Sequence, residues 1–178
     1  FEIYYACAMS CLIAQPINWR LSAEEITRII EDGEPSVFIC QKEFLELQHE
    51  VRATVTSNIT YLEYGPETDE SYETLVTQAS AIDLYPDIGN ADPVLILYTG
   101  GTTGLSKGAL HTHHSLYMGM LNQTVAERVV PSDVYMLTGQ MFHIPVALAM
   151  NYIAHGCPCV LMNFDAKLAL ELIQNEKV

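Results

Sequence analysis

Short apolar runs alternate along the chain with stretches in which apolar residues recur every three or four positions. The short runs, at residues 12–14, 37–40, 59–62, 94–97, 109–111, 134–137 and 159–162, predict β-strands. The longer periodic stretches, at residues 22–33, 44–51, 72–79, 113–128 and 144–154, predict helices, and the two ends of the chain also read as helical. This alternation is typical of α/β proteins, so we expect mixed β-sheets flanked by helices.

Two helices carry signals at their first residues. Ser22 and Glu25 have the spacing of a capping box, in which each side chain binds the backbone N–H of the other residue. The helix that follows repeats isoleucine on one face and is expected to stop at Gly33. Asp165 is the expected N-cap of the last helix.

The charge of the chain excludes some partners. Its 178 residues are 49% hydrophobic, enough for a packed core, and 22 acidic residues against 8 basic ones give a net charge of −14. We therefore expect neither a nucleic-acid partner nor attraction to an anionic membrane. The longest apolar tract, residues 141–162, is interrupted by polar residues, glycine and proline, so no transmembrane segment is expected.

Cysteine and histidine give weaker signals. Five cysteines, an odd number in mostly apolar surroundings, favour a reducing, cytoplasmic location over a disulfide framework. His111, His113 and His114 could suggest a metal cluster, but neighbouring positions diverge on a strand or helix. Surface or capping histidines are therefore the preferred interpretation.

The most informative segment is residues 98–108, Tyr-Thr-Gly-Gly-Thr-Thr-Gly-Leu-Ser-Lys-Gly, directly after the apolar run at 94–97. Glycines let backbone N–H groups approach an anion, threonine hydroxyls add donors, and Lys107 adds a positive charge. Between Ile88 and Glu127 the only acidic residue is Asp92. This combination predicts a loop that binds nucleotide phosphates.

Two common phosphate loops fit this segment badly. The P-loop pattern, counted from Gly101, places Lys107 correctly but finds Ser106 where glycine is required and Gly108 where a hydroxyl residue is required. The dinucleotide pattern G-x-G-x-x-G is absent.

The segment instead resembles the phosphate loop of the acyl-adenylate-forming (AMP-binding) enzymes, whose usual form is Tyr-Thr-Ser-Gly-Thr-Thr-Gly-x-Pro-Lys-Gly. Only Gly100 and Ser106 depart from the specified positions. Residues 15–25, 109–113, 141–143 and 156–161 also resemble segments of this family, in particular its acyl-CoA synthetases. The resemblance implies that residues 1–178 are part of the large N-terminal domain, truncated at both ends, and that the C-terminal domain with its catalytic lysine is absent.

The resemblance also implies the chemistry. A carboxylate, a fatty or aryl acid, attacks the α-phosphate of Mg·ATP to give an acyl-adenylate, and coenzyme A then displaces AMP. The implied phosphate ligands are Thr99, Gly100, Gly101, Thr102, Thr103, Gly104, Ser106, Lys107 and Gly108. Thr102 would also contribute to the Mg²⁺ site, and His143 would line the acyl pocket beside the reacting carboxylate as the implied catalytic residue.

Other interpretations stay open from the sequence alone. The chain could be a divergent P-loop-like NTPase that uses Lys107, or a non-catalytic interaction module with a vestigial phosphate loop. His143 could be a buried structural histidine. The acyl substrate is not specified, and a homodimer stays open.

The two departures from the family pattern predict a weaker phosphate loop. Gly100 removes a hydroxyl donor, and Ser106 removes a backbone constraint just before Lys107. Changing Gly100→Ser and Ser106→Pro together should lower the KM for ATP of the intact enzyme, because the loop becomes more ordered. An unchanged KM for ATP would refute this.

The missing family segments predict that residues 1–178 alone do not form acyl-adenylate. The family's Tyr-Gly-x-Thr-Glu stretch and ribose-binding aspartate do not occur in the sequence. We expect no ATP–pyrophosphate exchange from the isolated 178-residue chain, and exchange above background would overturn this expectation.

Overall fold

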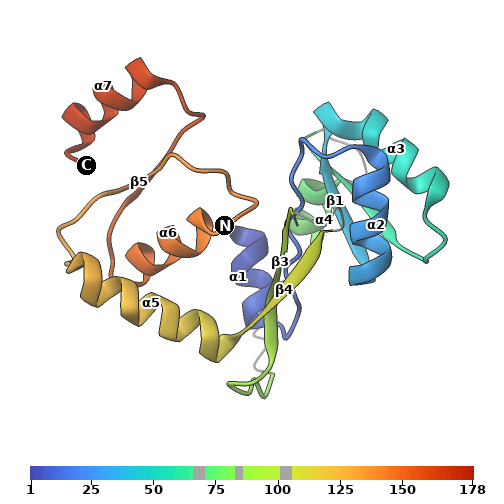
Figure 1. The fold of residues 1–178 in the computed structure, drawn as a ribbon, viewed down its shortest axis with the longest axis horizontal. Helices are drawn as coiled ribbons and strands as arrows, with labels where there is room; N and C mark the ends of the chain where they lie inside the picture. The colour runs from blue at the N-terminus through green and yellow to red at the C-terminus, as the bar shows by residue number, and fades with distance from the viewer. Residues whose placement is uncertain (66–70, 83–85, 101–105) are drawn as a thin grey trace. The chain divides into compact units, whose positions relative to one another are not determined.

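The computed structural model describes residues 1–65, 71–82, 86–100 and 106–178. The chain forms two compact units: the first comprises Phe1–Pro16, Pro86–Leu97 and Leu110–Val178, and the second comprises Ile17–Tyr85 and Tyr98–Ala109. In chain order the elements are α1 (Glu2–Met9), α2 (Ala23–Gly33), β1 (Val37–Gln41), the 3₁₀ turn η1 (Lys42–Phe44), α3 (Leu45–Thr54), β2 (Thr60–Tyr64), α4 (Tyr72–Gln78), β3 (Pro93–Thr99), β4 (Lys107–Thr112), α5 (His113–Glu127), β5 (Tyr135–Leu137), α6 (Pro145–Ala154), β6 (Cys159–Leu161) and α7 (Ala166–Glu176) (Figure 1).

The described strands form three two-stranded sheets, β1–β2, β3–β4 and β5–β6. β1 pairs with β2 in parallel from Val37↔Thr60 onward, and β5 pairs with β6 in parallel from Tyr135↔Cys159 onward. A helix lies between the two strands of each parallel pair, α3 in one and α6 in the other, which is the βαβ arrangement that parallel pairing requires. The expected α/β fold of β-sheets flanked by helices is confirmed.

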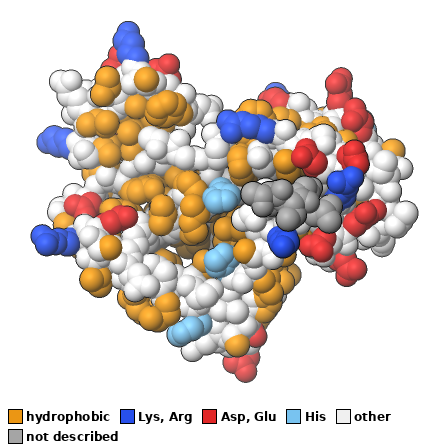
Figure 2. Space-filling view, viewed as in Figure 1, with side chains coloured by type: hydrophobic (Ala, Val, Ile, Leu, Met, Phe, Trp, Pro, Cys, Tyr) orange, Lys and Arg blue, Asp and Glu red, His pale blue; other side chains and the backbone are white. Residues whose placement is uncertain are grey.

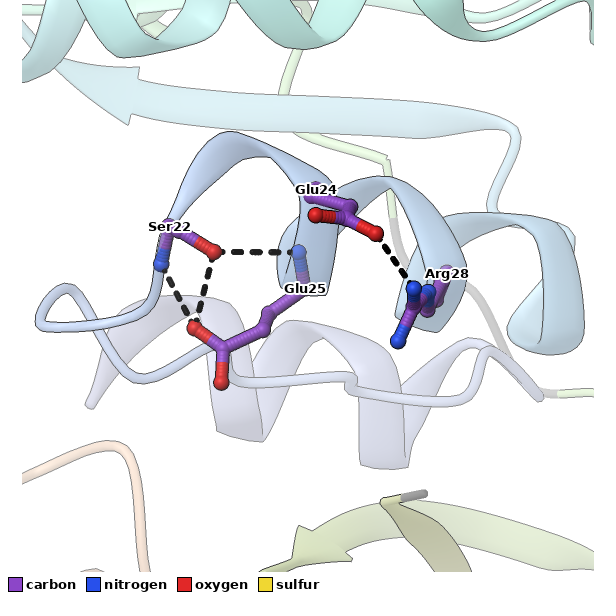
Figure 3. Close-up of polar contacts among 4 residues, drawn as sticks. All are labelled: Ser22, Glu24, Glu25 and Arg28. Atoms are coloured by element: carbon purple, nitrogen blue, oxygen red, sulfur yellow. Dashed lines mark hydrogen bonds and ion pairs between the residues drawn. The ribbon is translucent and has the colours of Figure 1, made fainter. Parts of the chain in front are cut away.

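The second unit is built around α2, whose first turn is fixed by the predicted capping box. The Ser22 backbone N–H donates to Glu25 Oε2 at 2.8 Å, and the Glu25 N–H donates to Ser22 Oγ at 3.3 Å. Figure 3 shows this pair together with the ion pair between Glu24, in the same first turn, and Arg28 one turn further on. The bonds from Ser22 lower the pKa of Glu25, so its carboxylate stays charged where the positive end of the helix dipole favours it.

The buried face of α2 supplies the core of this unit. Ile26 and Ile30 pack with Val51 of α3 and with Ile59, and Ile30 and Val51 are fully buried. The helix ends at Gly33 as predicted, but the left-handed residue after it is Glu34, with φ of 45°. The position that most favours glycine therefore lies one residue later than the sequence suggested.

The core of the first unit lies where residues 1–16 meet β3. Val94, Leu95 and Leu97 are buried together with Ala14. The predicted strand at residues 12–14 is wrong: only Ala14 pairs, in a single parallel bridge to Leu95, and Leu12 and Ile13 are exposed. Pro16 follows two residues later and has no N–H to continue a ladder.

A buried polar contact joins α5 and α6 in the first unit. Asn151 is 1% exposed, and its Nδ2 donates to Thr124 Oγ1 at 3.2 Å. His155 Nδ1 lies 2.9 Å from the Asn151 carbonyl oxygen. A buried amide needs such partners, so this contact fixes how the two helices pair.

Apolar side chains are exposed over much of the first unit, where Figure 2 shows many hydrophobic residues on the visible face. On α5, Tyr117, Leu121 and Val125 recur every four residues and are 58%, 40% and 79% exposed. These residues form an exposed apolar stripe along one face of α5. No helix in the described ranges is both long and apolar enough to cross a bilayer.

Candidate phosphate-binding site

The strand that enters the predicted phosphate loop is held firmly. Val94, Leu95 and Leu97 of β3 are at most 5% exposed. The Ala14 N–H donates to the Val94 carbonyl at 2.9 Å, and the Ile96 N–H donates to the Ala14 carbonyl at 3.0 Å. The last residue of β3, Thr99, and the following Gly100 are exposed.

The predicted phosphate ligands divide into those the structure describes and those it does not. Thr99, Gly100, Ser106, Lys107 and Gly108 are described, and all five are exposed. Gly101, Thr102, Thr103 and Gly104 lie outside the described residues. Thr102 as a Mg²⁺ ligand therefore stays a prediction.

Lys107 begins β4, which is hydrogen-bonded to β3. None of the ion pairs between described residues involves Lys107. Asp92, the acidic residue nearest to it in sequence, accepts a bond of 2.8 Å from the Gly89 backbone N–H. The positive charge of Lys107 is thus accessible to an anionic ligand. The strand is exposed from Lys107 to Leu110.

A serine side chain has room at Gly100. A Cβ added there meets no described atom within 4 Å, and the residue does not adopt a left-handed backbone. The family's serine is therefore compatible with the backbone at this position.

Tyr98, immediately before the loop, makes a bond that sequence reasoning missed. Its hydroxyl donates to Asp32 Oδ2 of α2 at 2.6 Å. Burial first, and then the bond to Asp32 and the negative charge of that carboxylate, raise the pKa of Tyr98, so the phenol stays a donor at neutral pH. The two residues are 66 positions apart in the sequence, and no local pattern could have paired them.

His143 lies in a turn before α6, in the first unit. Its side chain is exposed, so the alternative of a buried structural histidine is wrong. The His143 N–H donates to the Gln140 carbonyl at 3.3 Å, and the Val146 N–H donates to the His143 carbonyl at 3.2 Å. The Tyr4 hydroxyl donates to the Met141 carbonyl at 2.7 Å, which ties this turn to α1.

Gly139 packs closely against Pro145, the first residue of α6. A Cβ added there would lie 2.5 Å from Pro145 Cγ and 2.8 Å from Pro145 Cβ, closer than real Cβ contacts. The turn that carries His143 thus depends on a close contact between the Gly139 backbone and the Pro145 ring, which only glycine permits.

The other residues that could bind a metal do not come together in the described part of the chain. No group of three or more histidine, cysteine or acidic residues within the described part of the chain could hold a metal ion. All five cysteines are free; Cys40 and Cys157 are buried, and Cys11 is exposed.

The AMP-binding enzyme family model matches residues 1–178. This chain belongs to the AMP-binding enzyme family. It is 29% identical over 178 residues to the long-chain-fatty-acid–CoA ligase FadD13 of Mycobacterium tuberculosis, a match that covers 99% of this chain and 35% of that protein. The chain thus spans about a third of the length of this relative.

Solved structures agree with this assignment. ATP-bound MatB from Rhodopseudomonas palustris superposes with a TM-score of 0.84 at 27% identity, over 97% of this chain and 35% of that one. The inhibitor-bound N-terminal domain of FACL13 from Mycobacterium tuberculosis gives a TM-score of 0.80 at 28% identity, over 99% of this chain and 44% of that one. The fold is therefore that of part of the acyl-CoA ligase N-terminal domain, and the alternatives of a P-loop NTPase and an interaction module gain no support.

The close approach at Gly139 gives a stability prediction. Gly139→Ala should lower the free energy of unfolding by about 1–3 kcal/mol, because the new methyl group must displace the rigid Pro145 ring. Urea denaturation followed by circular dichroism measures this change.

Gly119→Ala is the matched control, since a Cβ there meets open space on the exposed side of α5. It should be neutral or stabilising by up to about 1 kcal/mol, because alanine favours a helix over glycine. Equal stability of the two variants would contradict the steric interpretation.

Proposed function

We propose that this chain supplies the ATP-phosphate-binding part of an AMP-forming acid–CoA ligase. The observation that carries the proposal is the loop between the buried strand β3 and the exposed Lys107. The family match and the likeness to an ATP-bound structure support it. Residues 1–178 would form part of the large N-terminal domain, and would be inactive without the remainder.

The described residues have the chemistry that a triphosphate requires. Thr99 and Ser106 each offer a hydroxyl at one base of the loop, and Gly100, which is exposed, has no side chain to keep an anion from its backbone. Lys107 adds a positive charge in a segment with little acid. These groups fit the β- and γ-phosphates, while Thr102 would contribute to binding the associated Mg²⁺.

The proposed reaction places Lys107 beside the leaving group. The substrate carboxylate attacks the α-phosphorus, and the bond from that phosphorus to the bridging oxygen breaks. Negative charge then develops on pyrophosphate, and the Lys107 ammonium stabilises that charge. The coenzyme A thiol afterwards attacks the acyl carbon and releases AMP.

His143 is proposed to line the acyl pocket. Its exposed side chain and its fixed turn are compatible with a contact to substrate. The acid would be a fatty or aryl carboxylate, in keeping with a relative named as a long-chain-fatty-acid–CoA ligase.

Replacing Lys107 tests the proposed function. In the intact enzyme, Lys107→Gln should reduce kcat/KM for ATP by about 100-fold, because it removes a charge that stabilises the leaving group. Lys107→Arg should recover part of the activity. The assay measures AMP and pyrophosphate release with and without a carboxylic acid.

Lys167→Gln is the control, since Lys167 is an exposed lysine paired with Glu171 on α7. It should leave the rate unchanged. Acid-independent release of ADP would refute the ligase assignment, and full activity of Lys107→Gln would refute the role of the lysine.

A further inference from the structure

The bond between Tyr98 and Asp32 joins the entrance of the phosphate loop to a helix of the same unit. Tyr98 directly precedes Thr99, the first proposed phosphate ligand, and the Tyr98 hydroxyl donates to Asp32 Oδ2 at 2.6 Å. This distance is shorter than is usual between two neutral oxygens and is typical of a charge-assisted hydroxyl–carboxylate bond. No other side-chain bond between described residues joins residues 98–109 to the rest of their unit.

The acceptor stands on a rigid element. α2 is held by its capping box at one end and by three buried isoleucines along its length, Ile26, Ile29 and Ile30. Asp32 is the last residue but one of this helix. A group on such a helix can fix the position of whatever it binds.

Asp32 is badly placed to stabilise its own helix. It lies in the last turn, where the helix dipole is negative, and no basic residue stands there. A carboxylate at that position is unfavourable for the helix. Any stabilisation that Asp32 gives to the structure therefore comes through its hydrogen bond with Tyr98.

The two sides of the loop are supported unequally. On the entering side, β3 is buried up to Leu97 and Tyr98 is bonded to Asp32. On the leaving side, Lys107 to Leu110 are all exposed. Among the described residues, the entering side is therefore the one that makes a side-chain hydrogen bond to the rest of its unit.

We propose that Asp32 and Tyr98 are positioning residues for the phosphate loop. Their bond holds the end of β3 so that Thr99 and Gly100 present their donors in the place where the triphosphate binds. This inference rests on the proposed function. It differs from the roles given to Thr99–Gly108, because neither Asp32 nor the Tyr98 hydroxyl is required to touch the nucleotide.

Kinetics of the intact enzyme test the inference. Tyr98→Phe and Asp32→Ala should each raise the KM for ATP about three- to tenfold, the effect of losing one hydrogen bond. The KM for the carboxylic acid should stay unchanged. Asp32→Asn, which keeps an oxygen that can accept from the phenol, should recover part of the affinity, and the double variant Tyr98→Phe/Asp32→Ala should be no worse than either single variant.

Glu31→Ala is the matched control, because Glu31 is the exposed acidic neighbour of Asp32 on α2. It should leave both KM values unchanged. An unchanged KM for ATP in Tyr98→Phe and Asp32→Ala would overturn the inference. So would a parallel rise in both KM values accompanied by a lower melting temperature, because that would indicate general destabilisation.

Amide hydrogen exchange gives a readout that does not depend on catalysis. In Tyr98→Phe, the peptide covering residues 99–108 should exchange faster than in the unaltered protein, while peptides from α3 should not change. Equal exchange would overturn the inference even if the kinetics were ambiguous. If the unaltered enzyme releases no AMP, the proposed function fails and the inference falls with it; if it releases AMP and the variants match it, only the inference fails.

Discussion

The burial of β3 is the constraint on which the candidate site depends. Val94, Leu95 and Leu97 lie in the core with Ala14, and two backbone hydrogen bonds to Ala14 hold the strand on either side of Leu95. A strand held in this way can end at the exposed residues Thr99 and Gly100 without losing its own position. Binding residues on loops depend on such scaffolds, because the loop itself provides little packing.

Polar contacts then determine where individual segments lie. The Tyr98 hydroxyl binds Asp32 of α2, the Tyr4 hydroxyl binds the turn that carries His143, and Asn151 joins α5 to α6. Each contact joins residues that are between 27 and 137 positions apart in the sequence. In this protein apolar burial supports the elements, while single hydrogen bonds join segments that lie far apart in the sequence.

The sequence predicted the local features well. The capping box, the isoleucine face of α2, the N-cap at Asp165 and the alternation of helices and strands all follow from spacings of a few residues, and the structure confirms them. The strand at residues 12–14 failed, because apolar composition does not show whether a pairing partner continues beyond one residue. The left-handed position after α2 falls on Glu34 instead of Gly33, a shift that composition alone could not reveal.

The sequence by itself determined the α/β class, the position of the predicted phosphate loop and its resemblance to the AMP-binding family, since these are encoded in contiguous residues. Tertiary structure alone decided that Tyr98 binds Asp32, that Gly139 must remain small against Pro145, and that His143 is exposed. The physical reason is the same in each case. Contacts between distant segments depend on how the chain folds back on itself, and a linear pattern carries that information only where a motif spans both partners.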